Sequence, residues 1–343
     1  MVNKNTAERF HEYLRRRISP LETYQDLLAF PRYLEIETVN ACNARCPMCT
    51  IADWERGFVP MTDGLFNKIA DEIVTHSDEI LRVSLYRDGE PLIDKKLPER
   101  VARLKEGGIK NTAIATNVSL LNEERARALL HAGLDLIILS IDSLDKEVYE
   151  SIRVRLKFEE VLENAIKLIE LRDQIRPETK IWIRMIRQPS NQHEWPAYRD
   201  FWSPKVSSND RVYYHNLHNW GGQLVDSSHF APSLEPQLPC VALWSLLVVL
   251  CNGDVPLCNV DFNNRHPTGS VLNNSIEEIW KSQLLEQRRG WHLTDQKSQI
   301  SLCTNCNVWD ENKAEAYAIL GDDRPVESGG ISSEYASDIE LRL

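Results

Sequence analysis

Short apolar runs alternate with amphipathic stretches along the first two thirds of the chain. The apolar runs predict β-strands at 33–39, 80–86, 112–116, 136–141, 181–186 and 212–215. The stretches between them predict helices near 62–75, 95–107, 122–132, 158–173 and 193–201. Alternation at this spacing indicates parallel strands joined by helical crossovers. We therefore expect an α/β fold, whose six units form either a partial barrel or an open doubly wound sheet.

The same pattern divides the chain into four parts. Residues 1–30 are predicted as an N-terminal helical extension, and residues 31–220 hold the strand–helix units. We expect a second, smaller domain at 221–320 and a flexible polar tail at 321–343.

The smaller domain has its own pattern of elements. Its first part is rich in Gly, Ser and Pro and is predicted to be a loop. Two short strands follow, at 246–250 and 255–257, and Asn252-Gly253 between them is a strong hairpin turn signal. A helix is predicted near 275–288. The expected domain is thus a β-hairpin plus a helix.

Composition and charge exclude several classes of protein. The chain has 343 residues, 42% of them hydrophobic, and a formal net charge of −11. An acidic surface disfavours unaided binding to nucleic acid or anionic lipid. No run approaches the roughly 18 apolar residues of a membrane span, and the polar N-terminus lacks the apolar segment of a signal peptide. We expect a cytoplasmic protein with no nucleic-acid or membrane partner.

Eight cysteines fall into two groups. They are Cys42, Cys46, Cys49, Cys240, Cys251, Cys258, Cys303 and Cys306. In a long chain without a signal peptide, clustered cysteines bind metal or do redox chemistry more often than they form disulfides. A long cysteine-free stretch separates the groups, which predicts two sites.

The first group has the spacing C-x3-C-x2-C and follows the first predicted strand. Thiolates at Cys42, Cys46 and Cys49 suit an iron–sulfur cluster or zinc. Three ligands leave one iron of a four-iron cluster open to a small molecule. Zinc would need a fourth protein ligand, which no nearby Cys or His supplies. The alternative is a zinc knot or three buried thiols without chemistry.

The second group surrounds the predicted hairpin. Cys240 and Cys258 bracket it, and Cys303 and Cys306 form a C-x2-C pair further on. Four cysteines can close a structural zinc site or complete a four-iron cluster. From the two ligand pairs alone, zinc is slightly favoured.

The first array, in the segment ETVNACNARCPMCT, resembles the signature of the radical S-adenosylmethionine (SAM) superfamily. Together with the motifs below, the resemblance extends over roughly residues 33–310. It implies a partial (β/α)6 TIM-like barrel and a cluster whose open iron chelates the amino and carboxylate groups of SAM. In that family, one electron cleaves SAM to methionine and a 5′-deoxyadenosyl radical, which abstracts hydrogen from a substrate.

Further positions resemble the SAM-binding motifs of that family. Asp88-Gly89-Glu90-Pro91 is similar to the family's GGEP, with Asp88 in place of the first Gly. The resemblance implies that this turn receives the SAM amino group, that an S-x-D pair contacts the ribose, and that an Arg in strand five binds the carboxylate. The implied cofactor contacts are Gly89, Glu90, Pro91, Thr116, Asn117, Ser140, Asp142 and Arg184, and Arg153 lies in a YESIR segment that relatives share.

The second group resembles the auxiliary-cluster domain called SPASM in its full form and twitch in its short form. The pattern is PC-x12-G-x4-C, then the helix segment from Ser275 to Trp280, then L-C-x2-C. No cysteine follows Cys306, so the resemblance implies a twitch domain. It reverses the preference for zinc and implies one auxiliary cluster, fully ligated by Cys240, Cys258, Cys303 and Cys306. The expected cofactors are therefore two 4Fe-4S clusters and SAM.

Cys251 remains outside both ligand sets. It is interpreted as a buried small apolar residue, as a thiol that donates hydrogen to a substrate radical, as in radical SAM epimerases, or as a swapped cluster ligand. Other candidate substrate contacts follow the sixth strand: Tyr213, Tyr214, His215, His218, Asn219 and Trp220. Such a mixture suits a polyhydroxylated ring, and it is equally typical of an ordinary folded loop.

The motifs also resemble those of the 2-deoxy-scyllo-inosamine dehydrogenases of aminocyclitol antibiotic biosynthesis. This predicts a radical SAM oxidoreductase for a carbohydrate-like substrate in natural-product biosynthesis, reduced by a flavodoxin or ferredoxin-type donor. Epimerisation with Cys251 as catalytic donor, and elimination or decarboxylation, are the alternatives for the radical. A ribosomal-peptide maturase is the alternative class. The small-molecule reading is preferred because the first 30 residues are too short for a peptide-recognition domain.

Overall fold

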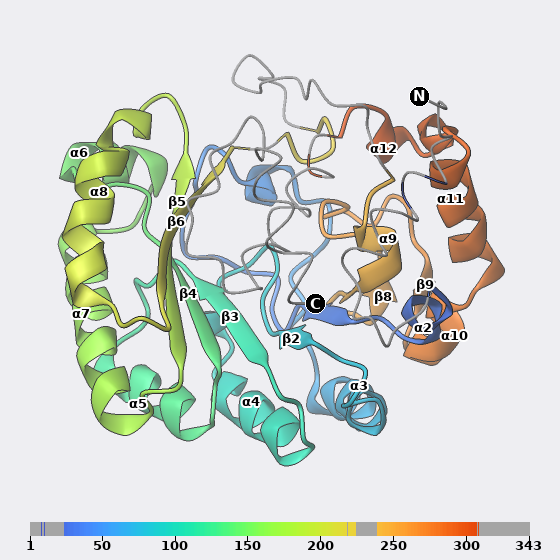
Figure 1. Ribbon diagram of the computed structural model, residues 1–343, viewed down its shortest axis with the longest axis horizontal. Helices are drawn as coiled ribbons and strands as arrows, with labels where there is room; N and C mark the ends of the chain where they lie inside the picture. The colour runs from blue at the N-terminus through green and yellow to red at the C-terminus, as the bar shows by residue number, and fades with distance from the viewer. Residues whose placement is uncertain are drawn as a thin grey trace.

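The computed structural model describes residues 8, 10, 24–217, 219–223, 239–306 and 308. Its centre is a curved parallel sheet of seven strands in the order β6-β5-β4-β3-β2-β1-β7 (Figure 1). The strands are β1 Tyr33–Ile36, β2 Arg82–Ser84, β3 Thr112–Thr116, β4 Leu136–Ser140, β5 Lys180–Arg187, β6 Arg211–Asn216 and β7 Leu246–Val249. The six strands predicted from the apolar runs are confirmed, and they form the partial barrel rather than an open doubly wound sheet.

Helices cover the outer face of the sheet (Figure 1). They are α3 Asp63–Thr75, α4 Leu97–Glu106, α5 Glu123–His131, α6 Lys146–Ile152, α7 Phe158–Ile175 and α8 Trp195–Trp202. Two begin at capping residues visible in the sequence, since the side chains of Thr62 and Asn122 accept hydrogen bonds from the backbone N–H of Leu65 and Arg125. Short 3-10 helices link the elements: η1 Thr50–Asp53, η2 Pro91–Ile93, η3 Gln192–Glu194, η4 Ser203–Lys205 and η6 Lys297–Gln299.

The predicted pairing of the C-terminal hairpin is wrong. Strand β7 pairs in parallel with β1, from Tyr33 with Leu246 to Ile36 with Val249. Strand β8, Asp254–Val255, pairs instead with β9, Gly269–Ser270. The turn itself lies where expected, with Gly253 at φ +89° and Leu250 N–H donating to Asp254 O at 2.8 Å. The run Leu246–Val249 is apolar on both faces, which suits a strand inside a parallel sheet better than one in an exposed hairpin.

The remaining helices belong to the C-terminal region beside β7. They are α9 Ala242–Ser245, α10 Ile276–Trp280, α11 Gln283–Leu293 and α12 Ser301–Thr304. The single helix predicted near 275–288 is thus two helices. The break follows from capping, because the Ser282 side chain accepts from Leu285 N–H and starts a new helix.

Part of the predicted N-terminal extension packs on this region. Helix α2, Tyr24–Ala29, lies beside α10, and the Trp280 indole donates to Leu27 O at 3.1 Å. Phe10 contacts Trp244 with ring centroids 4.6 Å apart. The rest of the extension and the predicted tail lie outside the described residues, and the domain boundaries stay predictions.

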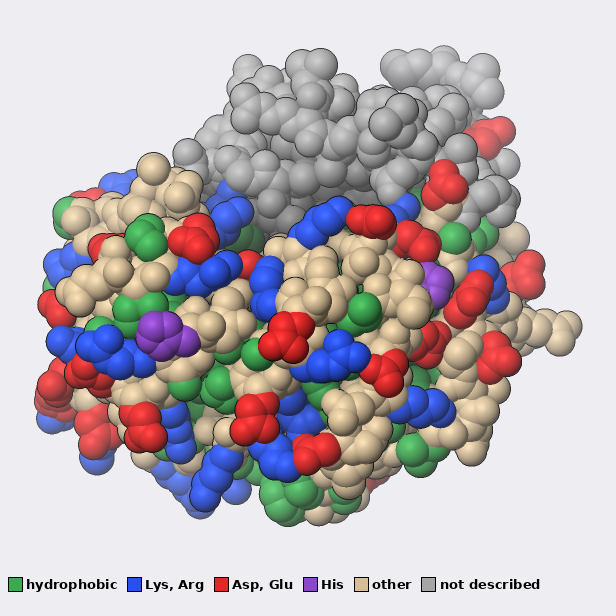
Figure 2. Space-filling model, turned by 90° about the horizontal axis from the view of Figure 1, so that it is seen from below, with side chains coloured by type: hydrophobic (Ala, Val, Ile, Leu, Met, Phe, Trp, Pro, Cys, Tyr) green, Lys and Arg blue, Asp and Glu red, His purple; other side chains and the backbone are tan. Residues whose placement is uncertain are grey.

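The surface and the helices bear on possible partners. The face in Figure 2 mixes acidic and basic side chains over its described part, without one broad field of a single sign. Among the described residues, no helix has both the length and the apolar character to cross a membrane.

A buried ion pair connects helix α7 to the residue that precedes β6. The Arg172 guanidinium on α7 donates to both carboxylate oxygens of Asp210 at 2.7 and 2.6 Å, and neither side chain is exposed. Asp210 also accepts from Ile181 N–H at 2.6 Å. Burial alone would raise the pKa of Asp210, but the hydrogen bonds from Arg172 and from the backbone N–H groups of Ile181 and Ser207 lower it overall.

We predict that Asp210→Asn lowers the free energy of unfolding by about 3 kcal/mol at neutral pH, because the buried Arg172 guanidinium then keeps, among the described residues, only the exposed Asp173 carboxylate as an ionic partner. Since the folded-state pKa of Asp210 is depressed, its contribution is complete above about pH 5 and is lost as the pH falls below about 4. Urea unfolding at several pH values measures this. Asp200→Asn, at an exposed pair with Arg199, is the control and should change little; an equal loss in both variants would contradict the prediction.

Candidate active site

The first three cysteines lie together in the loop after β1, at the carboxyl edge of the sheet where barrel enzymes place their chemistry. Cys49 N–H donates to Cys46 O at 3.0 Å, and Ala44 N–H lies 3.4 Å from Cys42 Sγ. Burial, with smaller contributions from the neighbouring Cys46 and Cys42, raises the pKa of the Cys49 thiol to about 11. A thiol with a raised pKa gives up its proton more readily when a metal binds its sulfur.

The Gly89-Glu90 turn packs directly on this loop. A Cβ atom on Gly89 would lie 2.6 Å from Val39 O and 2.7 Å from Ala41 O, so only glycine fits there. Glu90 N–H donates to Ala41 O at 2.8 Å. The turn that the sequence assigned to SAM therefore lies against the backbone that leads into Cys42.

The Glu90 carboxylate connects this turn to the end of β3. It is buried and accepts hydrogen bonds from the Thr116 hydroxyl and from Asn117 N–H, both at 2.7 Å. Burial raises the pKa of Glu90, while these two hydrogen bonds act in the opposite direction. Predicted contacts from two strands are thus brought together around one carboxylate.

Val118, the residue after Asn117, has a strained backbone conformation. Val118 has a φ of 71° and is fully buried, which is rare for a β-branched residue. Before it, the Asn117 side chain donates to Asn43 Oδ1 at 2.9 Å and points at Cys42 Sγ, 3.8 Å away. The strained backbone at Val118 follows directly on the amide that lies beside Cys42, and strained residues cluster at functional sites.

Asp142 and Arg153 form a pair that reaches Cys46. Arg153 Nε donates to Asp142 Oδ2 at 2.6 Å, and its Nη1 lies 3.8 Å from Cys46 Sγ. The other Asp142 oxygen accepts from Ile186 N–H at 2.7 Å. The carboxylate thus positions a cation beside Cys46, and its predicted contact with the SAM ribose stays a prediction.

Ser140 and Arg184 lie side by side on β4 and β5. Arg184 donates to the Ser140 hydroxyl at 3.0 Å. Arg184 Nε is buried and has no hydrogen-bond partner in the described part of the chain. An unpaired buried donor at this edge fits the predicted role of binding a carboxylate.

The four cysteines of the second group line one cavity. The residues around it are Cys240, Leu243, Leu257, Cys258, Asn259, Val260, His292, Lys297, Leu302, Cys303, Cys306 and Val308. Within the described ranges, no three His, Cys, Asp or Glu side chains converge as a single metal ion requires. A four-iron cluster is held by four thiolates around a cube, and four cysteines around one cavity are the donor set that such a cluster requires. Burial, with a smaller contribution from Lys297, lowers the pKa of His292 to about 4.

Cys251 does not line that cavity. It is buried, and its N–H donates to Glu37 Oε2 at 3.1 Å. Burial and the Glu37 carboxylate raise the pKa of its thiol to about 12. The placement favours neither a swapped cluster ligand nor a reactive thiolate.

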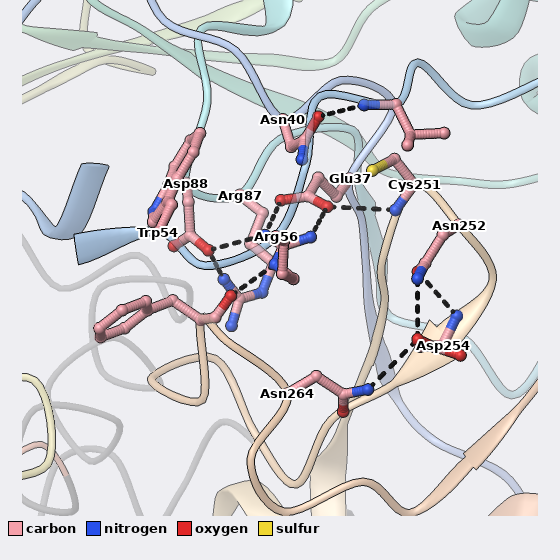
Figure 3. A network of polar contacts seen from close by, with 12 residues as sticks. Glu37, Asn40, Trp54, Arg56, Arg87, Asp88, Cys251, Asn252, Asp254 and Asn264 are labelled. Atoms are coloured by element: carbon pink, nitrogen blue, oxygen red, sulfur yellow. Dashed lines mark hydrogen bonds and ion pairs between the residues drawn. The ribbon is translucent and has the colours of Figure 1, made fainter. Parts of the chain in front are cut away.

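A buried charge network around Glu37 is the feature that the sequence did not predict (Figure 3). Arg56 donates to both Glu37 oxygens at 2.6 and 2.7 Å and, through Nε, to Phe262 O at 2.6 Å. Asp88 pairs with Arg87 and lies 3.7 Å from Arg56. The replacement of the motif's first glycine by Asp88 therefore adds a carboxylate that joins this network.

Arg87 extends the network to the second cysteine group, since its Nη2 donates to Cys258 O at 3.3 Å. Trp220 makes a second connection: its indole donates to Met48 O at 3.1 Å, and its ring lies 6.4 Å from that of Phe262. Side chains thus link the loop of the first cysteines to the segment that carries Cys258.

The other candidate substrate residues take different places. Tyr213 and His215 are two residues apart in β6 and therefore lie on the same face of the strand. Their rings lie 5.2 Å apart. Tyr214 is buried on the opposite face against Trp195. Asn219 donates to Asn305 O at 2.7 Å, next to Cys306. His218 lies outside the described residues.

Comparison with known families identifies the class of protein. A model of the radical SAM superfamily matches residues 36–183, and a model of the iron–sulfur cluster-binding SPASM domain matches residues 240–307. The first match contains the three-cysteine loop, and the second contains all four cavity cysteines. The chain therefore carries a radical SAM domain followed by a C-terminal SPASM domain. These domains imply a 4Fe-4S cluster with SAM in the first and iron–sulfur binding in the second.

Curated relatives match part of the chain. A tungsten-containing aldehyde ferredoxin oxidoreductase cofactor-modifying protein from Pyrococcus furiosus is 33% identical over 113 residues, which are 33% of this chain and 31% of that protein. A GTP 3′,8-cyclase from Chlorobaculum tepidum is 34% identical over 142 residues, 40% of this chain and 41% of the cyclase. The chain thus spans less than half the length of these relatives.

Solved structures share the fold over most of the chain. BtrN in complex with AdoMet and 2-DOIA is 21% identical with a TM-score of 0.56, covering 81% of this chain and 93% of BtrN. SuiB from Streptococcus suis, bound to its precursor peptide SuiA, is 16% identical with a TM-score of 0.61. The match covers 82% of this chain and 70% of SuiB. The structure of anSMEcpe with bound AdoMet is 13% identical with a TM-score of 0.59. The match covers 91% of this chain and 96% of anSMEcpe.

We predict that anaerobically reconstituted protein holds about eight irons, from two four-iron clusters. The triple variant with Cys42, Cys46 and Cys49 changed to Ala should keep about four, because the cavity cysteines are untouched. Cys251→Ala is the control and should keep all eight, since its thiol lies outside both ligand sets. Metal analysis measures both; zinc in place of the remaining iron would contradict the assignment of the cavity.

Proposed function

We propose that this enzyme oxidises an alcohol group of a carbohydrate-like small molecule, such as a sugar, an aminocyclitol or a sugar nucleoside, in natural-product biosynthesis. The observation that carries the proposal is the cavity lined by four cysteines. Four thiolates complete the coordination of a four-iron cluster. Such a cluster has no open iron for substrate, which suits electron transfer.

The bound cofactors supply a 5′-deoxyadenosyl radical at the first site and an electron acceptor at the second. Oxidation of a CH–OH group then balances as follows. The carbon would lose its hydrogen atom to the bound cofactor and one electron to the second cluster, and the hydroxyl would lose its proton to a base as the C=O bond forms. Among the described residues, His215 on the same face of β6 as Tyr213 is suited to hold the hydroxyl and accept its proton.

Two features support a small polar substrate. Ser140 is the last residue of β4, and Arg184 lies within β5, where it pairs with Tyr213 of β6 in the register of the sheet. Hydrogen-bonding and aromatic side chains together suit a polyhydroxylated ring. BtrN, which shares the fold, has a solved complex with AdoMet and 2-DOIA.

The proposed reaction requires an electron donor and a reducing environment. Reductive cleavage of SAM requires a low-potential donor, for which a flavodoxin or ferredoxin-type protein is suited. That requirement agrees with a cytoplasmic location, where thiols and clusters remain reduced.

Epimerisation is the second candidate, and one observation favours it. Cys251 keeps its S–H bond, because the pKa of its thiol is raised to about 12, and a hydrogen-atom donor must be protonated. Against this, the Glu37 carboxylate hydrogen-bonds the thiol and raises its pKa. That partner suits a fixed buried residue as well as a donor. No described contact favours elimination or decarboxylation.

A peptide maturase is the candidate from another class. Its support is the shared fold with SuiB, whose solved complex holds a precursor peptide. A shared fold does not carry the substrate with it, so the small-molecule proposal is preferred on the residues of β4–β6. A precursor-peptide gene next to this one would favour the maturase.

We predict that Cys251→Ala retains most product formation with SAM, a chemical reductant and the correct alcohol. Loss of a small buried side chain costs about 1 kcal/mol in stability and leaves the oxidation steps intact. Mass spectrometry of an anaerobic reaction should show loss of two hydrogens from the substrate, starting with 2-DOIA as a test compound. In heavy water, no deuterium should enter the reacting carbon.

The opposite result identifies the epimerase. A Cys251→Ala enzyme that makes 5′-deoxyadenosine without product, together with solvent deuterium in the wild-type product, would overturn the dehydrogenase. Cys251→Ser is the matched variant, because it keeps the shape and a hydrogen bond to Glu37 but removes the weak S–H bond.

A further inference from the structure

His292 is a buried side chain with an unused hydrogen-bonding nitrogen at the auxiliary-cluster cavity. It lies on α11, is 4% exposed and lines the cavity with the four cysteines. Its Nε2 atom is buried and has no hydrogen-bond partner in the described structure. An unpaired buried polar atom costs stability, which requires an explanation at this position.

The other ring nitrogen fixes the position of the proton. Cys240 N–H donates to His292 Nδ1 at 3.4 Å. A ring that accepts a hydrogen bond at Nδ1 carries its proton at Nε2. The unused nitrogen is therefore an N–H donor, and it borders a space whose other polar walls include the Cys240, Cys258, Cys303 and Cys306 thiols.

We propose that His292 donates a hydrogen bond from Nε2 to a sulfur of the auxiliary cluster and thereby raises its reduction potential. A hydrogen bond to sulfur stabilises the more negative, reduced form of the cluster, because it offsets part of the added charge. The benefit for alcohol oxidation rests on the proposed function, since a higher potential makes the cluster a better acceptor of the substrate's electron. The effect on potential holds for any reaction.

The test compares reduction potentials with the SAM cluster absent. The full-length chain with Cys42, Cys46 and Cys49 changed to Ala is reconstituted, and the remaining cluster is titrated while reduction is followed by electron paramagnetic resonance. Into this background go His292→Leu, which removes the donor, and His292→Gln, which places an N–H near the former Nε2. His266→Leu is the control, because the His266 ring bonds Ser301 and does not line the cavity.

We expect His292→Leu to keep about four irons and to lower the reduced-to-oxidised ratio at fixed potential about tenfold, which is about 59 mV for one electron. His292→Gln should recover most of this shift, and His266→Leu should show none. An unchanged potential in His292→Leu would overturn the proposal. Loss of the cluster in His292→Leu, with its retention in His292→Gln, would also overturn it by making His292 necessary for cluster assembly.

A second measurement needs no variant at position 292. Pulsed paramagnetic resonance on the reduced cluster, with ¹⁵N-labelled histidine, should show a weak nitrogen coupling and an exchangeable proton coupling. A strong nitrogen coupling would mean direct ligation of iron, and no coupling would mean no contact; either contradicts the proposal. Both readouts are independent of substrate turnover, so a wrong assignment of the reaction leaves them unchanged.

Discussion

The parallel pairing of β1 with β7 is the interaction on which the rest of the site depends. Both strands end at the same edge of the sheet, and the pairing continues past them as Glu37 N–H donates to Val249 O at 2.9 Å. Strand β1 leads into the loop of Cys42, while β7 leads to Cys251 and then Cys258. One strand pair therefore brings the SAM-cluster loop beside the segment that begins the auxiliary site.

Buried charge completes this connection. Glu37 lies at the end of β1 with no exposed surface, and the Arg56 fork and Cys251 N–H together satisfy its oxygens. Removing water from these groups is costly, and the cost is offset only by such complete pairing. Through hydrogen bonds to Phe262 O and Cys258 O, two guanidinium groups connect the network at Glu37 to the segment that carries Cys258. These hydrogen bonds join the two regions in addition to the sheet.

The sequence predicted the elements whose information is local. Six strands and their helices follow from apolar periodicity, and both cysteine groups follow from ligand spacing. The pairing of β7 was missed because Asn252-Gly253 is a strong local turn signal, whereas the preference of Leu246–Val249 for β1 depends on a strand more than 200 residues away in sequence. The turn at Asn252-Gly253 forms, but the strand after it, β8, pairs with β9 outside the seven-stranded sheet.

Residues that act through long-range contacts had no comparable signal. Glu37 and Arg56 belong to a strand and a loop without any motif, and their pairing is visible only once the loop folds back. His292 is a single histidine in an amphipathic helix, a pattern that usually means a satisfied core residue. Asp142 was found by its S-x-D pattern, but its hydrogen bonds to Arg153 and Ile186 became apparent only from the structure.

The central claim is that one cluster has an open iron at the three-cysteine loop and the other is closed by four cysteines. Mössbauer spectroscopy of protein reconstituted with ⁵⁷Fe tests this most directly, recorded with and without SAM. We expect SAM to shift the signal of one iron in about eight, because only one iron lacks a protein ligand. No shift on saturation with SAM, or a shift in irons of both clusters, would contradict the assignment.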